Sequence, residues 1–164
     1  MTIGNIYVTS DTHFNHKNII EYCNRPYSSV EEMNKAIIDN WNSVVKDEDT
    51  VYMLGDFCLG GKEVIKELCS QLKGHKILIK GNHDHGTNTT YKEAGFESIF
   101  GEQVIVYFEH LDKTIHFSHH PKEDAHYLNL YGHVHDKPCD DEMHKCVCVE
   151  LWNYTPVLLD DLVK

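Results

Sequence analysis

One stretch of the chain decides the fold class, Ile77-Leu78-Ile79-Lys80-Gly81-Asn82-His83-Asp84. An apolar run typical of a β-strand leads into a glycine and then into three polar side chains that can bind metal or move protons. This order is typical of a site at the carboxyl end of a strand. Alone, the tetrapeptide 81–84 is a weak signal, because such residues are usually just a turn.

Three other polar segments follow apolar, β-rich runs of their own. They are Asp11-Thr12-His13, Gly55-Asp56 and Gly132-His133-Val134-His135. In a largely parallel sheet, ligands bind beyond the carboxyl ends of the strands, which meet at one edge. We therefore expect these loops and the 81–84 loop to converge on one metal centre.

The first half of the chain alternates strand-like and helical patterns. Strands are expected at residues 3–9, 50–54 and 76–80, and helices at 17–23, 30–46 and 63–72. The 30–46 helix has the clearest start, with Ser28-Ser29 as N-cap and Glu31-Glu32 placed for a capping box. The βαβαβ order predicts a largely parallel sheet with helices on its faces.

The second half changes character. After a short helix at 89–95, strand-like runs with short separations occupy 103–108, 113–117, 127–131 and 145–150. A closing strand and a helical turn are expected after Pro156. These runs predict a second, mostly antiparallel sheet packed on the first. The expected fold class is α/β, a two-sheet αββα sandwich formed by one domain over residues 1–164.

The composition argues against several classes of protein. No run approaches the roughly 18 apolar residues of a membrane span, and the N-terminus shows no signal-peptide pattern, so we expect a cytoplasmic protein without a membrane partner. The formal net charge of −11 argues against stable binding of duplex nucleic acid, which needs clustered Lys and Arg. A small phosphate ester stays possible, because bound metal ions supply local positive charge.

The six cysteines form no Cys-x-x-Cys pair, and we expect them to be reduced. Cys146 and Cys148 would share one face of a strand. A small metal site there is an alternative, but packing in the core is the preferred interpretation.

The polar side chains at the strand ends form a mixed set of oxygen and nitrogen ligands. The set has too few thiols for structural zinc and too much imidazole for calcium or magnesium alone, so divalent Mn, Fe, Zn, Co or Ni is expected, with Mn as first choice. Side chains two residues apart, as in Asp11/His13 and His133/His135, can reach two adjacent ions, and Asp56 can bridge them. Two-metal hydrolysis uses this arrangement: a bridging hydroxide attacks, and both ions hold the transition-state oxygens.

Taken together, the motifs resemble those of the calcineurin-like metallophosphoesterases. The five motifs are, in order, Asp11-x-His13, Gly55-Asp56, Gly81-Asn82-His83-Asp84, Ser118-His119 and Gly132-His133-x-His135. The match spans residues 8–135, and all five motifs are intact. Five ordered motifs are highly specific, whereas any single one is not. The 11–20 segment, with Arg25-Pro26 after it, resembles the compact bacterial and phage branch of the family.

The resemblance implies a division of roles. One metal takes Asp11, His13, Asp56 and His135, and the other takes Asp56, Asn82, His119 and His133. His83 is implied to contact the phosphate and to protonate the leaving alkoxide, which is a poor leaving group without an acid. Asp84 is implied to orient His83 and to favour its imidazolium form.

Three further residues are candidates for contact with the substrate. Arg25, the single arginine, could place a fork of donors on a phosphate, with a surface salt bridge as the alternative. His16 is close in sequence to two ligands. In Ser118-His119-His120-Pro121 the family pattern places the ligand at His119, so that His120 is left to face the substrate.

We therefore expect a hydrolase, a metal-dependent phosphoesterase acting on a phosphodiester or phosphomonoester of a nucleotide or other small phosphate ester. A chain of 164 residues has little room for a cap domain, which implies a shallow, accessible pocket. One alternative is a nuclease acting on strand ends, against which the acidic balance counts. Another is a non-catalytic metal-binding scaffold of the same fold, but such a protein should have lost its acid or a ligand.

Overall fold

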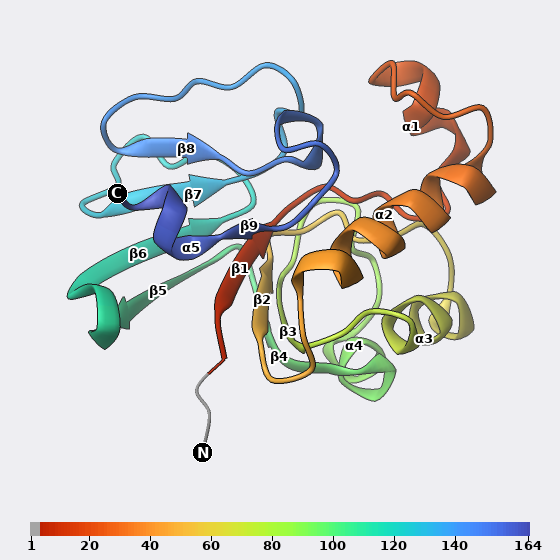
Figure 1. Ribbon diagram of the computed structural model, residues 1–164, viewed down its shortest axis with the longest axis horizontal. Coiled ribbons are helices and arrows are strands. Elements are labelled where there is room, and N and C mark those ends of the chain that lie inside the picture. The colour runs from red at the N-terminus through yellow and green to blue at the C-terminus, as the bar shows by residue number, and fades with distance from the viewer. Residues whose placement is uncertain (1–3) are drawn as a thin grey trace.

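The computed structural model describes residues 4–164, which build two β-sheets, and the helices between residues 17 and 94 lie on one side of the first sheet (Figure 1). The first sheet has the order β4-β3-β2-β1-β9, with the bounds β1 Ile6–Thr9, β2 Thr50–Met53, β3 His75–Ile79, β4 Phe96–Phe100 and β9 Val157–Leu158. The second has the order β5-β6-β7-β8, with the bounds β5 Gln103–Phe108, β6 Lys113–Ser118, β7 Leu128–Tyr131 and β8 His144–Cys146. The α/β two-sheet sandwich expected from the sequence is confirmed.

The first sheet follows the predicted βαβαβ order. β1 to β4 run parallel, whereas β9 pairs with β1 in the antiparallel direction. The helices are α1 Lys17–Tyr22, α2 Val30–Val44, α3 Lys62–Ser70, α4 Asn88–Ala94 and α5 Leu159–Leu162. Two details differ from the expectation: β4 was not predicted, and β1 begins at Ile6 rather than at residue 3, which lies outside the described residues.

The second sheet corrects the prediction of a mostly antiparallel arrangement. β5 and β6 form an antiparallel hairpin, but β6 pairs with β7, and β7 with β8, in the parallel direction. The connections 119–127 and 132–143 contain no helix, and their irregular chain makes the crossovers that helices usually make. The last strand is also shorter than expected, because a 3-10 helix, η2 Val149–Leu151, follows β8.

Helix α2 begins where the sequence pattern places it. The Ser29 hydroxyl, at the N-cap, accepts the backbone N–H of Glu32 at 3.1 Å, and the Glu32 carboxylate accepts the backbone N–H of Ser28, the residue before the N-cap, at 3.0 Å. This is a variant of the predicted capping box, shifted by one residue on the carboxylate side. The buried face of the helix carries Met33, Ile37 and Trp41, which pack with side chains of the first sheet. This face fixes the helical layer on one side of β1 to β4 (Figure 1).

The other side of the first sheet packs on the second sheet. The Tyr52 and Phe117 rings stack with centroids 4.4 Å apart, one from β2 and the other from β6. On the far side of the second sheet, Ile105 and Tyr107 of β5 are 53% and 58% exposed, so no helix of residues 4–164 covers that face of the sandwich. No helix among residues 4–164 is long and apolar enough to cross a membrane.

Candidate metal centre

The predicted ligands lie at one edge of the two sheets, where five loops leave strands. The parallel strands β1, β2 and β3 lead into Asp11, Asp56 and the 81–84 loop. In the second sheet, β6 and β7 are also parallel and lead into His119 and Gly132. The unpredicted parallel pairing of β6 with β7 therefore matters for the site, since it brings the last two motifs to a common edge.

Hydrogen bonds join these loops to one another. The backbone N–H of His13 donates to the carbonyl of Asp56 at 3.0 Å. The Asp11 carboxylate accepts the backbone N–H of His133 at 2.8 Å, and the Asp56 carboxylate accepts that of His83 at 2.9 Å. Each of the two aspartates thus holds a distant loop through one carboxylate oxygen. Its other carboxylate oxygen faces the other predicted ligands.

Five of the predicted ligands have left-handed backbone conformations. The φ angles are +59° at Asp11, +49° at His13, +54° at Asp56, +74° at His133 and +54° at His135. A residue other than glycine held in this region costs on the order of 1–3 kcal/mol and persists only where its surroundings fix it. Such residues gather at functional sites, and here four of them form two pairs of predicted ligands that lie two residues apart, Asp11/His13 and His133/His135.

Two glycines allow the loops to approach closely. A Cβ added to Gly132 would lie less than 3 Å from the Ser10 hydroxyl and from a carboxylate oxygen of Asp11. A Cβ added to Gly81 would lie equally close to the Asp56 carboxylate. The glycines in these two motifs are thus required by the space that the aspartates occupy.

We expect Gly132→Ala to destabilise the protein by about 1–3 kcal/mol, because the added methyl group overlaps buried polar atoms and must displace them. The matched control is Gly101→Ala, where an added Cβ meets nothing within 4 Å. Urea unfolding of the metal-free proteins measures both values. Equal free energies of unfolding for the two variants would contradict the close packing of Gly132 against Asp11.

One cluster of ligand atoms contains Asp11, His13, Asp56 and His135. His13 Nε2 lies 3.6 Å from Asp11 Oδ1 and 3.6 Å from Asp56 Oδ2, and His135 Nε2 lies 3.7 Å from Asp11 Oδ1. Ligands about 2.1 Å from one ion are themselves roughly 3–4 Å apart. Asp11 Oδ1 and His13 Nε2 are buried, and neither has a hydrogen-bond partner among residues 4–164. These atoms fit the first predicted ion.

A second cluster forms around His119. Its Nδ1–H donates to the Leu54 carbonyl at 2.7 Å, so its Nε2 faces Asn82 Oδ1 at 2.9 Å and Asp56 Oδ2 at 3.2 Å. Two oxygen acceptors beside a ring nitrogen require either a proton or a cation. Burial would lower the pKa of His119, but the hydrogen bond to Asp56 and the nearby carboxylate charges raise it to about 9. The surroundings of His119 Nε2 therefore favour a positive charge. His119, Asn82 and Asp56 together fit the second predicted ion.

His119 fits the ligand role better than its neighbour. His119 is buried, whereas His120 is exposed and its ring lies edge-on to that of His119 at 4.9 Å. The His133 ring lies 5.2 Å from His119 and 4.1 Å from His120. The three imidazoles nevertheless offer nitrogen atoms within 4.8 Å of one another, so His120 stands beside the second cluster.

The two aspartates carry negative charge in a buried place. Asp11 is 0% exposed and Asp56 is 2% exposed. Burial alone would raise the pKa of both carboxyl groups, but the surrounding imidazoles hold each below its ordinary value. Buried carboxylates that stay ionised need compensating positive charge, which protonated histidines or divalent cations can supply.

His83 lies at the rim of the site. Its ring is exposed and meets the His13 ring edge-on, with centroids 5.8 Å apart. Its neighbour Asp84 is buried and accepts the backbone N–H groups of Asp56, Phe57 and Gly81 at 2.8, 3.0 and 2.7 Å. Among the described residues no hydrogen bond joins Asp84 to the His83 ring. The contact expected between Asp84 and His83 is thus not observed, and the Asp84 carboxylate instead joins the backbones of the 56–57 and 81–84 loops.

Arg25 also differs from the expectation. Its side chain is 0% exposed and forms a buried ion pair with Glu150, with Nη2 2.8 Å from Oε2. Its Nη2 also donates to the backbone carbonyl of Asp11 and its Nη1 to that of Thr12, each at 2.7 Å, and Nη1 lies 3.6 Å from the Met33 sulfur. The buried guanidinium therefore supports the backbone of the site. It is not placed to contact a substrate, and its salt bridge is not on the surface.

Sequence patterns missed two side chains near the aspartates. Glu150 accepts a hydrogen bond from His135 Nδ1 at 3.0 Å, and the Cys148 thiol lies 3.3 Å from Asp11 Oδ2. Cys146 and Cys148 are buried against Tyr131, as the core interpretation requires. Neither Glu150 nor Cys148 belongs to a recognisable motif, and only the fold brings them to this edge.

His16 is the last predicted site residue. It is half-buried, and its Nδ1 lies 3.3 Å from Nδ1 of His13. The position beside a predicted ligand is compatible with contact to a substrate, and so is the exposed position of His120.

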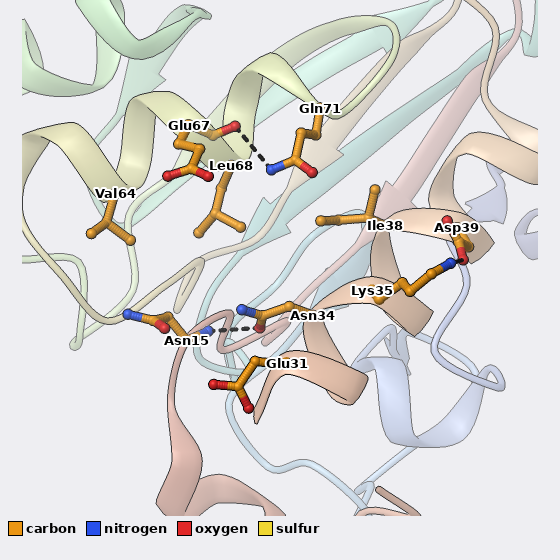
Figure 2. A pocket seen from close by; sticks show the side chains of 10 residues that line it. All are labelled: Asn15, Glu31, Asn34, Lys35, Ile38, Asp39, Val64, Glu67, Leu68 and Gln71. Atoms are coloured by element: carbon orange, nitrogen blue, oxygen red, sulfur yellow. Dashed lines mark hydrogen bonds and ion pairs between the residues drawn. The ribbon is translucent and has the colours of Figure 1, made fainter. Parts of the chain in front are cut away.

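A groove of about 560 Å³ lies elsewhere, between α2 and α3 (Figure 2). Its lining includes Glu31, Lys35 and Glu67, and at one end the side chain of Asn34 accepts the backbone N–H of Asn15 at 2.8 Å. None of the predicted ligands lines this groove. The candidate site is therefore identified by its donor atoms and not by the depth of a cavity.

Comparison with known proteins gives a family match over most of the chain. Residues 5–151 match the calcineurin-like phosphoesterase superfamily domain. An uncharacterized protein of Methanocaldococcus jannaschii is 41% identical over 178 residues, covering 100% of this chain and 92% of the relative. The gene 66 protein of Mycobacterium phage L5 is 41% identical over 112 residues, which make up 66% of this chain and 52% of the phage protein.

Solved structures share the architecture. A protein of unknown function from Aquifex aeolicus superimposes with a TM-score of 0.78 at 28% identity, covering 97% of both chains. The nuclease MPE of Pseudomonas putida superimposes with a TM-score of 0.54 at 17% identity, covering 79% of this chain and 61% of the nuclease. At that identity the second likeness concerns the fold alone.

Proposed function

The chain belongs to the calcineurin-like phosphoesterase superfamily, and we propose that it uses two divalent metal ions to hydrolyse a phosphodiester bond of a nucleotide or another small phosphate ester. Phosphomonoester hydrolysis would use the same groups and is included in the proposal. Mn is the proposed ion, and Fe, Zn, Co and Ni suit the same mixed donor set.

One observation carries the proposal. Two buried ligand atoms of the 11–13 loop, Asp11 Oδ1 and His13 Nε2, lie 3.6 Å apart, and neither has a hydrogen-bond partner among the described residues. Nearly all buried polar groups in folded proteins are hydrogen-bonded, so unpartnered ones need an explanation. A cation held between them supplies that explanation, and the acceptor pair around His119 Nε2 supports it independently.

The residues of the site would bind the metal ions, donate a proton and contact the phosphate. The ions would be held by the two clusters, which share Asp56, and when bound they supply Lewis acidity toward the phosphoryl oxygens. His83, exposed at the rim, would give a proton to the leaving oxygen. His16 and His120 are proposed to contact the phosphate from either side of the centre.

Removal and return of metal test the proposal. EDTA-treated protein should bind two Mn²⁺ per chain and then hydrolyse bis(p-nitrophenyl) phosphate or p-nitrophenyl phosphate. At about 100 times Kd, binding stabilises the native state by about 2.7 kcal/mol, which raises Tm by roughly 5–10 °C for a chain of this size. Calorimetric stoichiometry, thermal unfolding and release of p-nitrophenol are the measurements. Two bound ions without hydrolysis above the metal-free control would point to a scaffold, and no bound ion would refute the centre itself.

A nuclease acting on strand ends is the second candidate, and a nuclease of Pseudomonas putida shares the fold. The net charge of −11 opposes it, because contacts to phosphates in nucleic acids come mainly from Lys and Arg. Binding of a labelled oligonucleotide at several salt concentrations separates the candidates. A steep fall of affinity with salt would support the nuclease.

A further inference from the structure

A single carboxylate oxygen connects the candidate metal centre to the only arginine of the chain. Glu150 Oε2 accepts hydrogen bonds from Arg25 Nε at 3.0 Å, from Arg25 Nη2 at 2.8 Å and from His135 Nδ1 at 3.0 Å. The Glu150 side chain is 4% exposed and that of Arg25 is 0% exposed. The three side chains therefore form one connected network, in which Arg25 and Glu150 are buried and His135 is partly exposed.

The contact with Glu150 decides which nitrogen of His135 can bind a metal. A carboxylate only accepts hydrogen bonds, so the ring nitrogen that faces it, Nδ1, carries the proton. The lone pair of His135 is then on Nε2, the atom that lies 3.7 Å from Asp11 Oδ1. A carboxylate behind a ligating histidine fixes its tautomer and orientation and raises its basicity.

Arg25 extends the network to a second loop. Its Nη2 donates to the carbonyl of Asp11 and its Nη1 to the carbonyl of Thr12, both at 2.7 Å. These carbonyls belong to the segment in which Asp11 and His13 have left-handed backbones. One guanidinium thus holds the strained loop that presents two ligands and also the carboxylate that orients a third.

Fold stability alone explains this arrangement poorly. Glu150 Oε1 is buried and has no hydrogen-bond partner among the described residues. A buried ion pair is often no better for stability than apolar side chains of similar volume. A role at the metal centre accounts for a charged pair in this place.

We propose that Glu150, held by Arg25, is a positioning residue for the ion that Asp11, His13, Asp56 and His135 would bind. It keeps His135 in the tautomer with Nε2 free, and through Arg25 it is coupled to the backbone of the 11–13 loop. The inference rests on the proposed function, because it requires the ion.

The network reaches only one half of the centre. His119, in the other cluster, is oriented by the backbone carbonyl of Leu54 at 2.7 Å and does not depend on Glu150. Removing the Glu150 carboxylate should therefore weaken one ion and leave the other unchanged. A general loss of packing would instead affect both ions.

Calorimetric titration of Mn²⁺ into metal-stripped Glu150→Ala, Glu150→Gln and wild-type protein tests the inference. We expect Glu150→Ala to weaken one of the two binding steps by about 10–100-fold, in the range found for lost partners of metal-ligating histidines, and to leave the other step within about twofold. Glu150→Gln keeps an acceptor for Nδ1–H and should lose less affinity at the same step. Glu142→Ala removes an exposed carboxylate and should bind both ions like the wild type.

The outcomes separate the inference from the proposed function. Wild-type protein that binds fewer than two ions would refute the dinuclear proposal. Wild-type protein that binds two ions, together with a folded Glu150→Ala that binds both equally well, would overturn only the inference. Should Glu150→Ala not fold, Glu150→Gln decides: unchanged affinity at both steps overturns the positioning role, and loss at one step supports it.

Discussion

Asp56→Asn should abolish most of the hydrolysis and weaken the binding of both ions. Asp56 Oδ2 is the atom that the two clusters share, 3.6 Å from His13 Nε2 and 3.2 Å from His119 Nε2. Asparagine removes the negative charge while keeping the shape of the side chain. The Lewis-acid contribution of a bound ion is several kcal/mol, so we expect turnover to fall roughly 1,000-fold or more. Turnover of bis(p-nitrophenyl) phosphate and calorimetric affinities for Mn²⁺ are the measurements.

Asparagine is the informative substitution at this position. It tolerates the left-handed backbone that Asp56 adopts, with φ of +54°, and its amide oxygen can still accept the backbone N–H of His83. Asp47→Asn is the matched control, since Asp47 is exposed in a turn away from the site. Two ions bound by Asp56→Asn as tightly as by the wild type would show that this carboxylate does not bridge them.

The sequence predicted those elements of the fold that neighbouring residues specify by themselves. The N-cap Ser29 with its partner Glu32 and the apolar stripe of α2 specify that helix without reference to the rest of the chain. Strand direction in the second sheet has no such local signal. Parallel pairing usually needs a helical crossover, and the irregular 119–127 connection makes the same crossover without a helical pattern to reveal it.

The same distinction applies to the site. Asp11, Asp56 and His119 could be proposed because each follows a strand and belongs to a recognisable motif, and the structure brings them within 4.8 Å. The pairing of Arg25 with Glu150 joins residues 125 positions apart, and neither residue type is unusual in its own segment. Such partners are set by tertiary packing, so an exposed role for the lone arginine was the natural but incorrect expectation.

His83→Ala should separate metal binding from proton transfer. The His83 ring is exposed, and its one hydrogen bond to the centre comes from the backbone N–H, which alanine keeps. We expect both Mn²⁺ affinities to stay within about twofold, while turnover of an alkyl phosphate ester falls by about 10²–10⁴-fold, the usual contribution of a positioned general acid. His85→Ala is the matched control, because His85 is an exposed histidine of the same loop whose ring lies 6.3 Å from that of His83.

The leaving group distinguishes an acid from a group that only binds the phosphate. An alkoxide needs a proton as it leaves, whereas p-nitrophenolate is stable as an anion and gains much less from an acid. If His83 is the acid, the loss in His83→Ala should be at least tenfold smaller for a p-nitrophenyl ester than for the alkyl ester. An equal loss for both esters would mean that His83 contacts the phosphate without donating a proton. Lost Mn²⁺ affinity would instead make the imidazole a ligand, which its exposed position beside His13 argues against.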